Sequence, residues 1–214
     1  MSDLKLSHEV AWNHDVIIQQ GQTEPLLFTL YSGMAIKCRE VRPGKTHVVS
    51  VVLPGDLVGL DFIYSGVAWS SVQAVTDITF CKFAPERWPE LLRSPSLASR
   101  VCETLVLDQR DLEDRLAVVS ACTGEGALAH FLISLYDRLW ARRLCHEDSF
   151  SLPLTNRQIA DAVGVTTVHL HRVLVKLRGK GILAQDGHRI KIHDISKLRE
   201  IACMPPRVTE RPLL

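Results

Sequence analysis

Short apolar segments separated by polar turns fill the first part of the chain. Residues 8–90 contain several such segments, each rich in Val, Ile, Phe and Thr and bounded by Gly, Pro, Ser or Asp. Within residues 35–39, apolar Ile36 and Cys38 alternate with basic side chains, the period of two that is typical of a half-buried strand. Repeated short strands at this spacing predict a sandwich or barrel. The expected strands are 27–31, 34–41, 46–53, 67–75 and 77–83.

The pattern then changes to a helical period. Residues 95–121 place apolar side chains on one narrow stripe of a single predicted helix, and two charged side chains fall on the same stripe. Val106 and Leu107 lie on the opposite side, where we expect them to pack on the β domain. A narrow stripe favours pairing with a second copy of the helix, while burial of both faces within one chain is the alternative. The expected dimer seam is Val101, Leu105, Asp108, Leu112, Arg115, Leu116 and Val119.

Two glycines follow this helix in the segment Thr123-Gly124-Glu125-Gly126 and predict a hinge. A second amphipathic helix is expected after the hinge, because apolar residues again recur at helical spacing. Residues 145–152 are expected to be a loop, and residues 203–214, with three prolines, a loose tail. The apolar positions of the second helix are Leu128, Phe131, Leu132, Leu135 and Leu139.

Residues 155–180 predict two short helices joined by a tight turn. Thr155 and Gln158 form a capping box, Gly164 ends the first helix, and Thr166 caps the second. The second helix has a basic outer face, so the pair has the design of a helix–turn–helix whose second helix fits the major groove of DNA. A plain helical hairpin in a core is the alternative. The inward positions are Ile159, Ala160, Val163, Leu170, Val173, Leu174 and Leu177.

A wing is predicted next. Residues 182–185 and 189–192 are strand-like, and Asp186-Gly187 between them is a strong two-residue hairpin signal. Polar and basic side chains at the helix starts, on the outer helix and on the wing are expected to meet DNA phosphates. They are Thr155, Thr166, His169, Lys176, Lys180, Arg189 and Lys191.

The charge distribution supports an anionic partner for the second half of the chain. The formal net charge is only +1, but residues 1–122 hold 11 Lys and Arg against 15 Asp and Glu, whereas residues 123–214 hold 14 against 9. Such asymmetry points to nucleic acid, although a solvated surface alone also gives it. The near-neutral total therefore does not argue against DNA binding.

Cysteine usage indicates a reducing compartment. The six cysteines form no C-x-x-C pair and no zinc-type spacing with histidine, and each is expected to be a small buried hydrophobe. His169 and His171 do not share a helix face, so no metal site is expected. The chain shows no signal peptide and no apolar run long enough to span a bilayer. We therefore expect a cytoplasmic protein without membrane association.

At this point the sequence resembles the CRP/FNR superfamily of bacterial transcription regulators over nearly its whole length. The resemblance is carried by Leu53-Pro54-Gly55-Asp56-Leu57-Val58-Gly59 and by residues 154–183, including Ile159-Ala160, Gly164 and His171-Arg172-Val173-Leu174. It implies an α+β fold with an N-terminal cyclic-nucleotide-binding-like β-roll (a double-stranded jelly roll), a long dimerisation helix and a C-terminal winged helix–turn–helix. The expected domains are 1–94, 95–122 and 123–203, with a tail at 204–214.

The resemblance also implies which residues read bases: Thr167, Val168, His171 and Arg172. Arg172 matches an arginine of the family motif, and its guanidinium suits a bidentate contact to guanine O6 and N7, worth about 1–3 kcal/mol of discrimination. Val168 stands where many relatives carry glutamate. A valine cannot accept a hydrogen bond from cytosine N4 but can touch a thymine methyl group, which leaves room for a different half-site.

The sequence lacks residues that other family members use to bind a cyclic nucleotide or an iron–sulfur cluster. Members that bind cyclic nucleotides use an arginine in the loop after the Leu53–Asp56 motif, yet no Arg or Lys lies between Asp56 and Phe80. A phosphate there would lack a charged partner, so we predict no cAMP binding. The first cysteine, Cys38, lies on a strand, so the iron–sulfur site of other members is not expected. Haem stays open, although no spacing selects a ligand pair.

No cofactor is therefore expected, and the effector is unknown. Abundance, thiol oxidation, or an apolar ligand near Phe62, Trp69 and Phe80 are the remaining means of control, if these aromatic residues are not simply core. The predicted function is a sequence-specific DNA-binding transcription regulator that acts as a homodimer on a pseudo-palindromic site, with RNA polymerase as a further partner. The alternative is an effector-binding or redox-sensing module in which DNA binding is secondary. A metal-dependent cupin-like enzyme is not expected, because His47 is the only histidine between residues 15 and 129.

Overall fold

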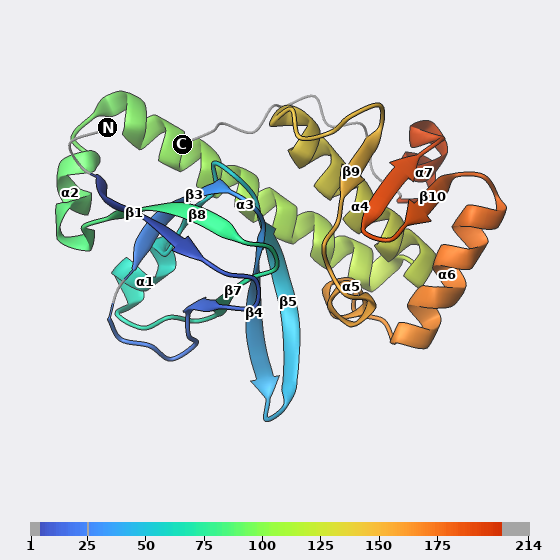
Figure 1. The fold of residues 1–214 in the computed structure, drawn as a ribbon, viewed down its shortest axis with the longest axis horizontal. Helices are drawn as coiled ribbons and strands as arrows, with labels where there is room; N and C mark the ends of the chain where they lie inside the picture. The colour runs from blue at the N-terminus through green and yellow to red at the C-terminus, as the bar shows by residue number, and fades with distance from the viewer. Residues whose placement is uncertain (1–4, 25, 203–214) are drawn as a thin grey trace. The chain divides into compact units, whose positions relative to one another are not determined.

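The computed structural model describes residues 5–24 and 26–202, which form two compact units divided between Thr104 and Leu105. The division falls inside helix α3 (Pro95–Ala121), which has the predicted bounds. Figure 1 shows antiparallel strands in the N-terminal part, then the long helix, then mostly helices. These elements confirm the predicted α+β class.

The first unit is a β-roll of two antiparallel sheets, each with four strands among the described residues. The strand orders are β1-β8-β3-β6 and β2-β7-β4-β5, so strands that are neighbours in a sheet are mostly not neighbours in sequence. Such crossing between two sheets is characteristic of a jelly roll. The strands are β1 (Lys5–Ala11), β2 (Val16–Ile18), β3 (Leu27–Ser32), β4 (Ala35–Arg42), β5 (Lys45–Val52), β6 (Leu57–Val58), β7 (Ser71–Ala74) and β8 (Ile78–Phe83).

Both sheets contribute side chains to one core. Phe28 and Phe80 come from one sheet, with ring centroids 4.9 Å apart, and Val72 comes from the other. Phe62, from helix α1 (Leu60–Ser65), is fully buried in the same cluster. Burial of apolar side chains from two facing sheets is the main stabilisation of such a roll.

The alternation predicted for β4 is confirmed, because Ile36 and Cys38 are buried while Arg39 is exposed. All five expected strands are present, although the expected strand 67–75 is limited to β7. The sequence pattern misses β2 and β6 because two or three residues carry too few positions to show a period. It misses β1 because this strand has no clear apolar face.

The Leu53–Gly59 motif forms a tight turn held by its own side chains. The backbone N–H of Leu53 donates to Asp56 Oδ2 over 2.9 Å. Gly59 has φ 102°, and a Cβ there would lie 2.0 Å from the carbonyl oxygen of Leu26. Only glycine fits both this left-handed conformation and this close approach of two backbones.

The start of α3 belongs to the core of the first unit. Val101 is 5% exposed and packs with Leu27, Phe83, Trp88 and Leu91. Two short helices, η2 (Pro85–Arg87) and α2 (Trp88–Leu91), precede α3 and supply part of this cluster. The assignment of Val101 to an exposed dimer seam is therefore wrong. The helical period predicts the direction in which the Val101 side chain points. It does not predict which residues of the same chain pack against that side chain.

The second unit surrounds helix α4 (Gly124–Ala141), which contacts α5 (Asn156–Val163), α6 (Thr167–Gly179) and α7 (Ile195–Ile201). The predicted apolar positions of α4 are all buried. Thr123 caps α4 by accepting a hydrogen bond from the backbone N–H of Gly126 over 3.4 Å. The two glycines therefore lie inside the helix, and the break after α3 falls at Cys122 and Thr123 rather than at a glycine hinge.

Several further expectations are corrected by the structure. The expected loop 145–152 contains strand β9 (Ser149–Ser151), which pairs with β11 (Arg189–Ile192). Three residues are too few to show a strand period, and their partner lies about 40 residues further along the chain. Val106, which was expected to be buried, is exposed. Cys38 and Cys81 are buried as expected, but Cys102 is exposed and Cys122 and Cys145 are half-buried.

The predicted tail at 203–214, including Cys203, lies outside the described residues. Among the residues that are described, no helix has both the length and the apolar character needed to cross a membrane.

Candidate nucleic-acid interface

Helices α5 and α6 form the predicted helix–turn–helix, and local signals start and stop each helix. The Thr155 backbone N–H donates to Gln158 Oε1 over 2.8 Å, and the Gln158 backbone N–H donates to Thr155 Oγ1 over 3.2 Å. This reciprocal pair is the predicted capping box. Gly164 ends α5 in the left-handed conformation with φ 78°, and Thr166 caps α6 by accepting from the His169 backbone N–H.

Helix α6 has a buried face and an exposed face. The inward positions Leu170, Val173, Leu174 and Leu177 are all buried, as predicted. The four positions expected to read bases, in the first two turns of α6, are all exposed on the opposite side. The structure therefore brings Thr167, Val168, His171 and Arg172 together on one accessible surface.

A three-stranded sheet flanks these helices, in the order β10-β11-β9 with β10 at Leu183–Asp186. Asp186 pairs with Arg189, so the hairpin turn consists of Gly187 and His188 rather than Asp186 and Gly187. The third strand, β9, is the element that the sequence did not reveal. Strand β9 pairs with the edge of β11 that faces away from β10, so the predicted hairpin is part of a three-stranded sheet.

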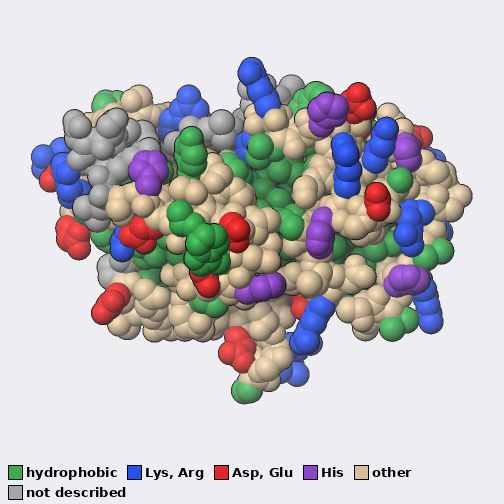
Figure 2. Space-filling model, viewed as in Figure 1, with side chains coloured by type: hydrophobic (Ala, Val, Ile, Leu, Met, Phe, Trp, Pro, Cys, Tyr) green, Lys and Arg blue, Asp and Glu red, His purple; other side chains and the backbone are tan. Residues whose placement is uncertain are grey.

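The residues expected to contact phosphate are found in different environments. Thr155 and Thr166 serve as helix caps, and the Arg189 guanidinium donates to Ser149 Oγ over 3.2 Å. Lys191 is exposed on β11. Figure 2 shows several Lys and Arg side chains, with His among them, over the part of the molecule that carries the C-terminal elements.

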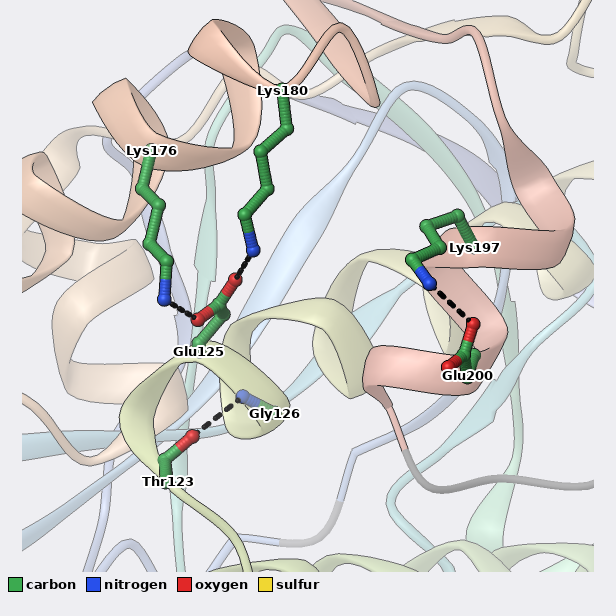
Figure 3. Close-up of polar contacts among 7 residues, drawn as sticks. All are labelled: Thr123, Glu125, Gly126, Lys176, Lys180, Lys197 and Glu200. Carbon is green, nitrogen blue, oxygen red and sulfur yellow. Dashed lines mark hydrogen bonds and ion pairs between the residues drawn. The ribbon is translucent and has the colours of Figure 1, made fainter.

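The other three expected phosphate ligands lie along one flank of α6. His169 lies against Gly124, where a Cβ would come within 2.3 Å of its Nε2. Lys176 and Lys180 both bind the carboxylate of Glu125, in the first turn of α4 (Figure 3). Lys180 Nζ lies 3.0 Å from Glu125 Oε1, and Lys176 Nζ is ion-paired with Oε2.

Glu125 is the residue of this surface that the sequence did not indicate. The hydrogen bond from Lys176, followed by that from Lys180, holds the pKa of its carboxyl below the ordinary value despite an opposing effect of burial. The carboxylate therefore stays charged at neutral pH. No local signal identifies this contact, since Glu125 and the lysines are more than 50 positions apart in sequence.

The remaining seam residues lie on α3 beyond Val101. Leu105, Leu112, Leu116 and Val119 are all largely exposed, with Leu112 at 57% and Leu116 at 71%. Monomeric proteins rarely leave several large apolar side chains exposed on one helix stripe. This stripe, defined as these four residues, is the second candidate binding surface.

The loop after the Leu53–Gly59 motif contains no Arg or Lys of its own, but the β-roll brings Lys37 close to it. Lys37 Nζ, from β4, lies 2.9 Å from Asp61 Oδ2 in α1, and both side chains are about a quarter exposed. The ammonium is thus already paired with a carboxylate. Phe62 and Phe80 are core residues, whereas Trp69 is exposed, so the three aromatic side chains do not line one apolar site. Over residues 5–24 and 26–202, no three His, Cys, Asp or Glu side chains gather to hold a metal ion.

Two family models match this chain in separate segments. A Crp-like helix-turn-helix domain matches residues 126–201, and a cyclic nucleotide-binding domain matches residues 12–94. The first segment contains the surface described above, and the second coincides with most of the β-roll.

Curated relatives match over most of the chain. The transcriptional activator protein FnrA of Stutzerimonas stutzeri is 25% identical over 181 residues, which cover 84% of this chain and 74% of that protein. The fumarate and nitrate reduction regulatory protein of Salmonella typhi is 28% identical over 193 residues, covering 86% of this chain and 77% of that protein.

Solved structures share the fold. The structure of FixK2 from Bradyrhizobium japonicum has a TM-score of 0.80 at 20% identity and covers 94% of this chain and 98% of its own. A CRP-family transcriptional regulator from Thermus thermophilus has a TM-score of 0.75 at 20% identity, covering 94% of this chain and all of its own.

Proposed function

This chain belongs to the CRP/FNR superfamily of DNA-binding transcription regulators, which are not enzymes, and we propose that it acts as a homodimer on a pseudo-palindromic DNA site. In such a complex the two α6 helices enter successive major grooves about 34 Å apart. The observation that carries the proposal is the exposed face of α6, with Thr167, Val168, His171 and Arg172 beside one another.

Sequence choice is assigned to Arg172 and its neighbours. The Arg172 side chain is exposed on a helix whose opposite face is anchored by four buried apolar residues, so its donors are held on a rigid support. A guanidinium in that position suits guanine O6 and N7, while Val168 offers a methyl contact to thymine. Phosphate contacts from Thr155, Thr166, His169, Arg189 and Lys191 would supply affinity and register.

Dimerisation is assigned to the α3 stripe. Four large apolar side chains that stay exposed in one chain become buried if two copies of α3 pack in parallel. Asp108 and Arg115 lie on the same side of the helix and would set the register of that pairing. A symmetric dimer presents two recognition helices to one duplex, which matches a pseudo-palindromic site.

Location and further partners follow from the same proposal. We infer that the protein acts in the cytoplasm and that it meets RNA polymerase at promoters. The β-roll supports a second possibility, an effector-binding module in which DNA binding is secondary, because a cyclic nucleotide-binding domain model matches it. We predict that cAMP itself does not bind, since Lys37 near the relevant loop is already paired with Asp61. Calorimetry with cAMP tests this point.

Selection of bound sites from random duplex DNA, with and without a reducing agent, tests the proposed function. Wild type is expected to enrich an inverted repeat whose half-sites contain a guanine that depends on Arg172. The variant Arg172→Ala is expected to lose about 1–3 kcal/mol of discrimination at that guanine and to keep weak, salt-sensitive binding. Enrichment of no sequence by wild type would contradict the proposal, and an unchanged preference in Arg172→Ala would contradict the assignment of Arg172.

A further inference from the structure

One flank of the recognition helix faces a carboxylate of its own chain. Lys176 and Lys180 extend from the last turns of α6 toward α4, and both ammonium groups reach the two oxygens of Glu125 (Figure 3). Both lysines remain about half exposed, whereas the Glu125 side chain is only 17% exposed. The lysines therefore sit at the surface, and the carboxylate lies beneath them.

The packing around Glu125 fixes its position. On one side, Gly124 lies against the His169 ring, and on the other a Cβ at Gly126 would lie 3.2 Å from the backbone oxygen of Ile201. The first turn of α4 is thus wedged between α6 and the end of α7, with glycines at both contacts. Glu125, between the two glycines, has its carboxylate directed at α6 (Figure 3).

The same chain supplies a contrasting ion pair. Lys197 and Glu200 on α7 form a pair of the same type over 2.7 Å, and Glu200 is 69% exposed. That pair is local to one helix turn and does not involve α6. Exposed pairs of this kind contribute little to stability and exchange readily with water.

From this geometry we propose that Glu125 sets the sequence-independent affinity for DNA: it occupies Lys176 and Lys180 and so withholds these two cations from DNA phosphates. Phosphate contacts raise the affinity for any sequence equally, because the backbone carries no sequence information. Withholding two of them lowers the affinity for every duplex by a similar factor and leaves the exposed face of α6 unchanged. The inference rests on the proposed DNA-binding function.

Charge and desolvation favour this arrangement over a purely structural brace. One carboxylate with a lowered pKa binds two ammonium groups, so it matches one of their charges and leaves a surplus of one. Because the lysines are half exposed, a phosphate oxygen could reach them and replace the acceptor once the charge of the carboxylate is removed. Helices α4 and α6 also touch where Gly124 lies against His169, a contact that does not involve the charge of Glu125.

The test measures duplex affinity as a function of salt for wild type and Glu125→Gln, on the selected site and on a random duplex. Glutamine keeps the size of the side chain and removes its charge. We expect Glu125→Gln to bind random DNA about tenfold more tightly at 0.1 M salt, with the slope of log K against log[salt] steeper by about 1 to 2. The affinity for the selected site should rise by a similar factor, so the ratio of specific to random affinity should stay nearly unchanged.

Two further variants make the result specific. Glu200→Gln removes the same charge from the Lys197 pair and is expected to change random-duplex affinity less than about twofold, since it frees no cation on α6. The triple variant Glu125→Gln, Lys176→Gln, Lys180→Gln is expected to return the salt slope to the wild-type value, because the released ammonium groups are gone.

The outcomes separate this inference from the proposed function. If wild type selects a site but Glu125→Gln behaves like Glu200→Gln, the lysines are not withheld and the inference is wrong. If Glu125→Gln keeps its circular dichroism spectrum but loses affinity for both duplexes, Glu125 is a brace of α6 and the inference is also wrong. If wild type binds no duplex, the proposed function fails first.

Discussion

Helices α3 and α4 follow one another in the chain, but α4 buries its apolar residues whereas α3 leaves most of its large apolar residues exposed. Helix α4 has 18 residues and buries ten of them, including Leu128, Leu132 and Leu139, against α5, α6 and α7. Helix α3 has 27 residues, all of them described by the structure, yet its buried hydrophobic residues are only Val101 and Val118. Leucines on its stripe are half exposed or more.

The difference shows what each helix requires for stability. An isolated helix in water is marginal, and most of its stability comes from packing of its apolar face. Helix α4 obtains that packing within its own unit. Helix α3 carries apolar residues at helical spacing without covering them, so the same pattern that predicts a helix also predicts a partner for it. A second copy of α3 is the partner that we propose.

The largest expected effect lies in α4. Leu132→Ala removes a side chain that is 1% exposed, and we expect the free energy of unfolding to fall by about 2–5 kcal/mol. Chemical denaturation followed by far-ultraviolet circular dichroism measures it. Leu112→Ala on α3 is the matched control: its smaller loss should vanish on dilution, because it acts through a dimer. A Leu112→Ala loss that persists at every protein concentration would show that α3 is covered within one chain.

The next effect concerns the α3 stripe. Leu112→Glu places two carboxylates in the proposed seam, and we expect the dimer dissociation constant to rise by about 100-fold or more. Sedimentation velocity over a range of concentrations measures it. Glu113→Gln, on an exposed position of the same helix, should leave the dissociation constant nearly unchanged. A wild-type protein that sediments as a monomer at all concentrations would contradict the proposed seam.

A smaller effect concerns the start of α4, where Glu125 forms ion pairs with Lys176 and Lys180 of the same chain. The pKa of Glu125 is lowered in the folded state, so its stabilising contribution is fully present above the ordinary pKa and is lost as pH falls through the lowered value. Wild type should exceed Glu125→Gln in unfolding free energy by about 1 kcal/mol at pH 7 and lose this advantage at acidic pH. Urea titrations from pH 7 downward measure the difference.

The control for this pH dependence is Glu200→Gln, whose pair is more exposed. It should show a much smaller difference from wild type at every pH. A wild-type advantage over Glu125→Gln that does not change with pH would mean that the glutamine is disfavoured by its shape rather than by its lack of charge.

The smallest effect concerns thiols beside the two helices. Cys102 on α3 is exposed, whereas burial, and to a lesser degree the nearby Asp148 and Asp137, raises the pKa of Cys145 to about 11. Only the thiolate is alkylated rapidly, so Cys145 should react at least about tenfold more slowly than Cys102 at pH 8. Peptide mass spectrometry after timed iodoacetamide treatment distinguishes them. Equal rates would show that the segment after α4 opens readily.

Much of the fold and of the site was open to prediction because the signals are local. The period of two around Ile36 gives β4, and the helical period gives α3 with its observed bounds. The Thr155 capping box and the left-handed Gly164 define the helix–turn–helix, since caps act within one turn of the backbone. The exposure of the α6 positions that we propose to read bases follows from the same periodicity.

Only the tertiary structure decided which groups meet across the chain. Strand β9 forms because β11 supplies backbone hydrogen-bond partners for it. Val101 is buried because Trp88 and Leu91 pack against it. Glu125 is tied to Lys176 and Lys180 because α4 and α6 pack against each other. Periodicity fixes the direction of a side chain on its own helix or strand, whereas burial and ion pairing depend on groups brought together by long-range packing. The sequence by itself thus determined the kind of regulator and its helix–turn–helix, and the tertiary structure decided which charges of α6 are already engaged.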